Sequence, residues 1–340
     1  MSQNEIKGFS REQIEQMCFD KGSQLPFDLP TVKKYGFSKC IREFAGLPSW
    51  FPITVEMQHG VVFNEKPLNI EINAPAYAVF FWYKYTLDEY PKYSKTRTYG
   101  LLAPFVSYRR KHNITQNSDA KGTLLFFSHT IGTTEHDKSV EEFIESFKNI
   151  PQEFYPLAVS VHMHDVEKGI HLKFLEKGVP VFTAGHEYHK DFPDRFYDML
   201  RRFKYAASDG IGSHTMYAAE MGTPFFIFGR PPVLHYHGDT QYKGKINFIE
   251  VLPRYKAAYD LFNTGPSKTV TPQQRECALE CLGEYISESP ASVKKVLIKS
   301  LFYYIFIGWI KKNILKIKER SQRRRLRREN EEYLNSKQKY

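Results

Sequence analysis

The segment KYAASDGIGSHTMYAAEMGTPFFIFG, residues 204–229, decides the fold of this chain. It predicts the end of a strand, a turn of small residues at Gly210-Ile211-Gly212-Ser213, and then a helix. A second strand follows, bounded by Gly222, Pro224 and Gly229. A strand, a turn, a helix and a strand in this order form one unit of an α/β protein.

The small-residue turn is a candidate anion site. Glycine lets the backbone come close to a ligand, and the helix directs unpaired N–H groups and its positive dipole end at the turn. Gly212 lies in the turn, Ser213 and His214 add side-chain donors, and Glu220 lies two helical turns further on. We therefore expect phosphate at the turn and the hydroxyls of a sugar ring near Glu220.

This arrangement resembles the donor-binding half of GT-B glycosyltransferases, in which a small-residue turn and the following helix hold the phosphates of a nucleotide sugar. In that family a helical glutamate followed by a Gly-x-Pro turn often binds the ribose, and Glu220-Met221-Gly222-Thr223-Pro224 matches that pattern. The resemblance implies an α/β fold with two Rossmann-like domains facing a cleft. The alternative is any βαβ unit with a glycine-rich turn.

Strands and helices alternate regularly before this segment. Strands are expected at residues 123–127, 157–162 and 179–183, and helices at 139–149, 167–177 and 192–203. Helices of this length between strands indicate a parallel sheet, in which ligands bind outside the carboxyl ends of the strands.

Hydroxyl and imidazole side chains follow the first three of these strands. They are Ser128, His129 and Thr130 in a turn entering a helix, His162 and His164 after the second strand, and His186 after the third. Zinc is one interpretation, but the i,i+2 spacing of His162 and His164 matches catalytic zinc sites poorly. We predict no metal and no other cofactor. The histidines then either contact the base or phosphate of the donor or serve structural roles.

Residues 1–118 are expected to form an N-terminal domain for the acceptor and the catalytic base. Its strands are expected within 51–60, 76–85 and 98–110, and a polar linker at 112–121 separates it from a donor domain at 119–290.

His59 follows the first strand, and a histidine titrating near neutral pH suits proton abstraction from a sugar hydroxyl. Glu56 is the other candidate base, and a turn histidine without a chemical role is the alternative. In the donor domain, Arg230 after the last strand is placed to pair with a phosphate.

Charge is concentrated at the C-terminal end of the chain. Residues 291–340 carry fifteen Lys and Arg against four Glu, so residues 1–290 are nearly neutral. The apolar run at 296–310 contains Lys299 and is shorter than the ~20 residues that span a bilayer. We expect an amphipathic basic helix at 291–340 that lies on an anionic membrane surface, aided by the arginines of 323–328. The alternative is a packed helix followed by a solvated basic tail.

Composition and charge narrow the function further. The chain has 340 residues, 41% of them hydrophobic and 15% aromatic, which indicates a folded protein. No nucleic-acid module signature is present, so we do not expect nucleic acid as a partner. Four cysteines without a convincing metal spacing, and the absence of a signal peptide, predict a cytoplasmic protein held peripherally on the inner face of the cell membrane.

Together these features predict a glycosyltransferase that moves a sugar from a nucleotide-sugar donor to a saccharide or lipid-linked saccharide in cell-surface polysaccharide synthesis. The chain lacks the paired-glutamate motif of many retaining GT-B members, which favours an inverting, metal-independent reaction. Two alternatives stay open. One is a nucleotide-sugar epimerase of the same fold, and the other is a nucleotide- or carbohydrate-binding protein without catalysis.

Overall fold

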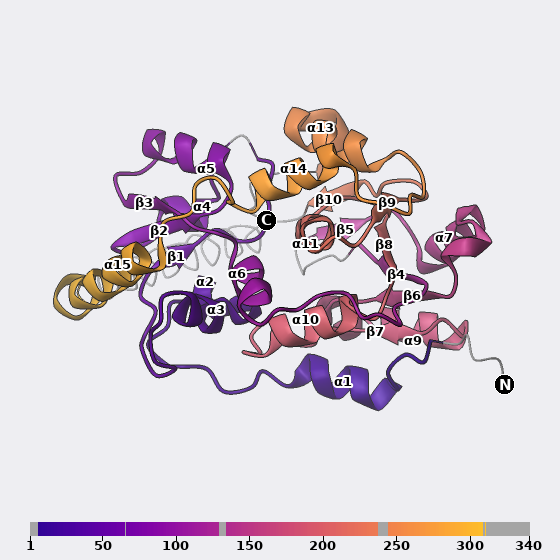
Figure 1. Ribbon diagram of the computed structural model, residues 1–340, viewed down its shortest axis with the longest axis horizontal. Helices are drawn as coiled ribbons and strands as arrows, with labels where there is room; N and C mark the ends of the chain where they lie inside the picture. The colour runs from indigo at the N-terminus through magenta and orange to yellow at the C-terminus, as the bar shows by residue number, and fades with distance from the viewer. Residues whose placement is uncertain (1–5, 65, 129–133, 237–243, 309, 311–340) are drawn as a thin grey trace, which may run out of the picture.

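Two parallel sheets, a small antiparallel sheet and the helices around them form the part of the protein that the structure describes (Figure 1). The structure is a computed structural model that describes residues 6–64, 66–128, 134–236, 244–308 and 310. The expected mixed α/β fold with parallel sheets is confirmed.

The larger sheet contains five parallel strands in the order β7-β6-β4-β8-β9. They are β4 (Thr123–Phe126), β6 (Leu157–Ser160), β7 (Val181–Phe182), β8 (Tyr205–Ser208) and β9 (Phe225–Ile227). The central strand β4 pairs on one side with β6, where Leu125 lies opposite Val159, and on the other with β8, where Leu125 lies opposite Ala207. Strands buried on both faces read as continuous apolar runs, which is why the sequence identified them.

Helices connect these strands as the sequence predicted. They are α7 (Val140–Glu145), α9 (Ile170–Glu176), α10 (Phe192–Leu200) and α11 (Ser213–Met221), with the short helix α8 (Met163–Glu167) added directly after β6. Ser139 caps α7 by accepting a hydrogen bond from the amide of Glu142. Gly222 ends α11 in the left-handed conformation, with φ of 91°, that glycine adopts without a steric penalty.

The smaller parallel sheet has the order β1-β2-β3 and is built from the N-terminal third of the chain. Its strands are β1 (Glu56–Met57), β2 (Ala78–Phe81) and β3 (Arg97–Gly100), and its helices are α2 (Pro30–Lys33), α3 (Phe37–Phe44), α4 (Asn69–Ile72), α5 (Lys84–Glu89) and α6 (Pro104–Lys111). The strand expected within 98–110 is β3, which ends at Gly100, and the second half of that range is helix α6. Pro104 starts α6 at its first turn, a position that proline favours because its missing N–H is not needed there.

A correction concerns the turn after β4, which we expected to lead directly into a helix. Residues Thr134–His136 form strand β5, which pairs antiparallel with β10 (Leu234–Tyr236). β10 pairs in turn with β11 (Gly244–Ile246). The partner of β5 lies about a hundred residues away in the sequence, so no local pattern revealed it.

One hydrophobic core extends across both sheets. Leu124 and Ala206 on one face of the larger sheet belong to the same buried cluster as Phe80 of the smaller sheet. On the other face, Leu125 and Ala207 pack with residues of α7, α9 and the N-terminal helix α1 (Arg11–Phe19). The two sheets are therefore held together by buried apolar contact.

Both ends of the chain cross between the sheets. Near the N terminus, the amide of Phe9 donates to the carbonyl of Val181 in β7 at 2.8 Å, which places the start of the chain on the larger sheet. After α12 (Phe248–Val251), α13 (Pro253–Phe262) and α14 (Pro272–Cys281), helix α15 (Pro290–Tyr303) returns to the smaller sheet. There the hydroxyl of Ser300 donates to the carbonyl of Thr54 at 2.7 Å. The proposed division at residues 118 and 290 stays a prediction.

The C-terminal region is described only as far as Ile310. The part of α15 near its start is buried, with Val293 and Leu297 in the core, whereas Phe302, Ile305 and Phe306 are exposed. Trp309, Lys311 and the arginines of 323–328 lie outside the described residues. Within the described part of the chain, no helix combines the length and the apolar character that a membrane span requires.

Ile286 lies against Gly100 of β3, so we expect a larger residue at Gly100 to destabilise the protein. A Cβ atom at Gly100 would overlap the carbonyl oxygen of Ile286, a backbone atom that cannot turn aside. We expect Gly100→Ala to lower the free energy of unfolding, measured by urea titration, by about 3 kcal/mol. Gly46→Ala is the control, because Gly46 has a positive φ, of 61°, but has open space around it. This variant should lose only the backbone strain energy of an alanine at positive φ, about 1 kcal/mol. Equal effects would show that residues 283–288 do not pack on β3.

A candidate ligand cavity between the two sheets

The connections of the larger sheet reverse direction at β4. From β4 the chain moves outward through β6 to β7, and it then crosses to β8 and β9 on the opposite side of β4. The connections that follow β4 and β8 therefore lead toward opposite edges of the sheet, an order that creates a crevice at the carboxyl ends of these two strands. Ligands of open α/β sheets bind in such a crevice.

A cavity of about 670 Å³ lies at this crevice, between the larger sheet and the loop that follows β1. Its lining comes from the ends of β4, β6, β7 and β8, from residues 59–64, and from the aromatic side chains Tyr35, Phe37, Phe63, Phe105, Phe126, Phe127, Phe192, Phe196, Tyr217, Tyr236, Phe248 and Tyr255. This volume is in the range of cavities that hold a cofactor or drug-sized ligand. Flat aromatic faces suit a heterocyclic base or a sugar ring.

The described lining contains no Asp, Glu, Lys or Arg side chain. A charged ligand would therefore be met by backbone dipoles, hydroxyls and imidazoles. The first turn of α11 is one of these, because Gly212 and Ser213 line the cavity and the positive end of the helix dipole lies there.

Hydrogen bonds fix the shape of the turn before α11. The amide of Ile211 donates to the Tyr255 hydroxyl at 3.2 Å, and the amide of Gly212 donates to the Thr215 hydroxyl at 3.1 Å. The Ser213 hydroxyl oxygen accepts from the amide of Val61 at 2.8 Å, and this bond links the larger sheet to the loop after β1. The predicted small-residue turn thus lies where the two sheets meet.

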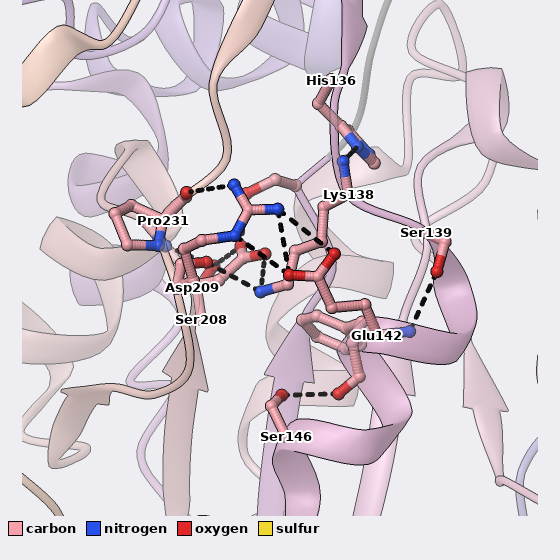
Figure 2. A network of polar contacts seen from close by, with 12 residues as sticks. His136, Lys138, Ser139, Glu142, Ser146, Ser208, Asp209 and Pro231 are labelled. Atoms are coloured by element: carbon pink, nitrogen blue, oxygen red, sulfur yellow. Dashed lines mark hydrogen bonds and ion pairs between the residues drawn. The ribbon is translucent and has the colours of Figure 1, made fainter.

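Beneath the crevice lies a buried ion pair that the sequence reasoning missed. The Lys138 ammonium lies 3.0 Å from the Asp209 carboxylate, and both side chains are 1% exposed. Lys138 also donates to the carbonyl of Arg230 at 2.8 Å, and the Ser128 hydroxyl donates to Asp209 at 2.6 Å (Figure 2). The pair ties β8 to the segment before α7 and to the segment after β9. An aspartate directly after an apolar strand, in YAASDG, was the available signal.

Arg230, predicted to pair with a donor phosphate, lies on the outer side of this network and is 44% exposed. Its guanidinium contacts Asp137 and Glu142 at 2.9 Å each. These two carboxylates neutralise the arginine, and Arg230 does not line the cavity although Pro231 and Pro232 do.

The predicted histidines separate into two groups. His59, His162 and His214 line the cavity, and the His214 ring stacks on Phe126 with 4.7 Å between ring centroids. His164 instead contacts Glu167 at 2.8 Å, outside the lining.

His186 also lies outside the lining. Its ring nitrogen Nδ1 accepts from the amide of Tyr188 at 3.0 Å, and its own amide donates to the carbonyl of Met17 at 2.9 Å. These bonds fix His186 between the loop after β7 and the end of α1. His129 and Thr130, the remaining predicted residues after β4, lie outside the described part of the chain.

His59 faces the cavity from the smaller sheet. Burial lowers the pKa of His59 to about 4, with a smaller contribution from the Lys34 cation, so its imidazole is neutral at pH 7. The expectation that His59 titrates near neutral pH was therefore wrong, because its ring is desolvated. Its position is fixed by Gln58, whose side-chain oxygen accepts from the amides of Trp82 and Tyr83 at 3.1 Å each. The Gln58 side-chain amide donates to the carbonyl of Gly60 at 2.7 Å.

Two carboxyl groups lie behind His59 rather than in the cavity. Glu56, the other candidate base, is buried and accepts a hydrogen bond from the Thr31 hydroxyl. Glu71 is buried as well, and burial raises its pKa to about 7. Glu71 accepts from the amides of His59 at 3.4 Å and Leu68 at 2.8 Å, so it supports the loop that carries His59.

Glu220 lies on the side of α11 that packs against α6. Its carboxylate is 1% exposed and contacts Arg109 at 2.6 Å and Arg110 at 3.0 Å. It does not line the cavity. The structure therefore brings together Ser128, His162, Gly212, Ser213, His214 and His59, and it places Glu56, His164, His186, Glu220 and Arg230 elsewhere.

Among the residues that the structure describes, no three His, Cys, Asp or Glu side chains are grouped as a metal ion would require.

Comparison with known proteins finds a distant structural likeness. No protein-family model matches the chain, and no curated protein matches its sequence. A solved structure of the wall teichoic acid polymerase TagF soaked with CDPG is similar with a TM-score of 0.33 and 11% identity, over 67% of this chain and 57% of that chain. This chain thus spans less than two thirds of that structure's chain, and at so low a TM-score the likeness carries no argument about the site. The resemblance to GT-B glycosyltransferases stays a proposal.

The contacts of Glu220 predict a role in stability. Glu220→Ala removes the carboxylate that pairs with the largely buried Arg109, whereas Arg110 keeps its ion pair with Glu284 at 2.8 Å, so we expect the free energy of unfolding to fall by about 3 kcal/mol. Glu142→Ala removes one carboxylate of the exposed Arg230 cluster and is the control, with an expected change of about 0.5 kcal/mol. Urea titration measures both. A Glu220 variant that keeps its stability but loses nucleotide affinity would instead identify Glu220 as a ligand-binding residue.

Proposed function

We propose that this chain is a transferase that takes a group from a nucleotide-activated donor bound in the cavity between the two sheets. One observation carries the proposal. The cavity lies at the carboxyl ends of β4 and β8, where the strand order reverses, and a neutral histidine faces it from the second sheet.

The donor phosphates are assigned to the first turn of α11, where Gly212 and Ser213 line the cavity. The base and sugar are assigned to the aromatic walls and to the hydroxyl of Ser128. Since the described lining holds no charged side chain, the positive end of the α11 dipole is assigned the electrostatic contact with the phosphates.

The transferred group is assigned as a sugar and the acceptor as a saccharide or glycolipid, following the resemblance of residues 204–229 to GT-B glycosyltransferases. In this reaction the acceptor hydroxyl attacks the anomeric carbon, the bond to the donor phosphate breaks, and His59 accepts the hydroxyl proton. The His59 imidazole is neutral at pH 7 and can accept the proton, and its lowered pKa makes it a weaker base than a histidine that titrates near neutral pH. Inversion at the anomeric carbon without a metal is the proposed stereochemistry, and cell-surface polysaccharide synthesis the proposed setting.

If a nucleotide binds in this cavity, a large side chain placed in the cavity should prevent nucleotide binding. Ser128 lines the cavity at the end of β4, so Ser128→Phe should abolish the thermal stabilisation that the best compound in a panel of nucleotides and nucleotide sugars gives the parent protein. Ser118→Phe is the control, because Ser118 is exposed in the loop before β4 and should leave that stabilisation unchanged. If Ser128→Phe kept its response to the nucleotide, the site would lie elsewhere.

The assignment of His59 predicts a loss of turnover without a loss of binding. His59→Ala should lower turnover of the nucleotide sugar by roughly 10²–10⁴-fold while calorimetry shows unchanged nucleotide affinity. His112→Ala, which changes an exposed histidine at the end of α6, should change neither. The acidic limb of kcat/KM in the parent protein should lie near pH 4, because the pKa of His59 is about 4. Nucleotide binding without any turnover in the parent protein would favour a binding module over an enzyme.

A further inference from the structure

A second cavity, of about 690 Å³, lies on the smaller sheet and has no lining residue in common with the first. Its walls are the segments that lead into β2 and β3 and one residue of α15, comprising Ile72, Asn73, Ala74, Pro75, Ala76, Tyr77, Ser94, Lys95, Thr96, Arg97 and Tyr303. Unlike the first cavity, it contains cationic side chains beside hydroxyl groups. This composition suits a phosphate group.

The two cations of the second cavity are available to a ligand. Lys95 and Arg97 are exposed, and no ion pair joins either of them to a carboxylate in the part of the chain that the structure describes. The Arg97 guanidinium lies 4.7 Å from the centre of the Tyr77 ring, which orients it at the cavity mouth. Tyr77 in turn lies 5.6 Å from the Tyr303 ring, so the cationic side of the cavity is connected to α15.

The end of α15 and the π-helix that follows it (Tyr304–Gly308) carry exposed apolar side chains beside this cavity. Phe302 is 59% exposed, Phe306 is 69% exposed, and Ile305, Ile307 and Ile310 are exposed as well. Figure 1 shows α15 extending outward beyond the three-stranded sheet, away from the larger sheet. Lys295 and Lys299 are exposed about two turns and one turn before Phe302, so cations border the apolar surface along the helix as well as at the cavity.

We propose that the second cavity binds the phosphate headgroup of an anionic lipid while the exposed end of α15 enters the boundary between headgroups and acyl chains. Lys95 and Arg97 contact the phosphate, Ser94 and Thr96 offer hydroxyl donors, and Phe302 and Phe306 enter the apolar layer. Cations around an aromatic apolar surface match both layers of an anionic membrane at once. Neither a soluble anion nor an apolar protein surface would use both features. This inference does not depend on the proposed reaction, and its test uses no nucleotide.

The test is co-sedimentation of the full-length chain with vesicles of phosphatidylglycerol and phosphatidylcholine. We expect binding to vesicles that contain phosphatidylglycerol, weaker binding as salt is raised, and no binding to phosphatidylcholine alone. The double variant Lys95→Gln/Arg97→Gln should bind about 30-fold more weakly, since each cation near the surface contributes about 1 kcal/mol. Lys177→Gln/Lys204→Gln is the matched control, because it removes two exposed cations from the larger-sheet side of the molecule. Equal losses in the two double variants would overturn the headgroup site.

A second pair of variants tests the apolar surface. Phe302→Ser/Phe306→Ser should lose most vesicle binding, whereas Phe19→Ser/Phe27→Ser, which changes two phenylalanines of similar exposure elsewhere, should keep it. The last measurement adds soluble sn-glycerol 3-phosphate at millimolar concentration as a competitor of the vesicles. We expect it to compete weakly with vesicles, because it lacks acyl chains. If it bound as tightly as the vesicles did, or if the Phe302/Phe306 variant bound vesicles normally, the cavity would be a site for a soluble phosphate compound and the proposal would be wrong.

Discussion

The reversal of strand order at β4 is the constraint on which the rest of this structure depends. Because β4 is paired on both sides, the chain must leave it toward β6 and later return to β8 on the opposite side, so the connections after these strands lead toward opposite edges of the sheet. The crevice at the carboxyl ends of β4 and β8 is not covered by the strands themselves. The loop after β1 covers it, and the bond from the Val61 amide to the Ser213 hydroxyl, at 2.8 Å, links that loop to the first turn of α11. A cavity bounded by both sheets follows from this arrangement.

The charged side chains near the cavity form ion pairs with one another outside its lining. Lys138 and Asp209 neutralise each other beneath the crevice, and Glu220 is held by two arginines on the far side of α11. A buried pair gains little net stability, but breaking one is costly, so such pairs hold the strand ends and α11 in one geometry. The described lining is left without charged side chains, so the positive dipole end of α11 at Gly212 and Ser213 meets no opposing charge there.

The sequence predicted the larger sheet well and the assignment of side chains to the cavity only in part. Runs such as Thr123–Phe126 and Tyr205–Ser208 are apolar on both faces, so they identify central strands without knowledge of their partners. Strand β5 was not predicted, because its partner β10 is remote in sequence. Glu220 was expected beside the ligand, yet α11 is buried all round, with Met216, Tyr217, Ala218 and Ala219 in the core, so no amphipathic pattern showed which face packs on α6. His186 was equally ambiguous, because a strand-end histidine can face a cavity or a neighbouring loop.

The central claim is that a nucleotide contacts both sheets at once in the cavity at β4 and β8. Amide hydrogen exchange with and without the best nucleotide of the panel tests it most directly, because it reports protection along the whole chain. The account predicts slower exchange in three separate segments, at residues 126–128, 208–216 and 58–63, and little change around Lys95 and Arg97. Protection confined to one sheet, or protection that leaves residues 208–216 unchanged, would contradict the account.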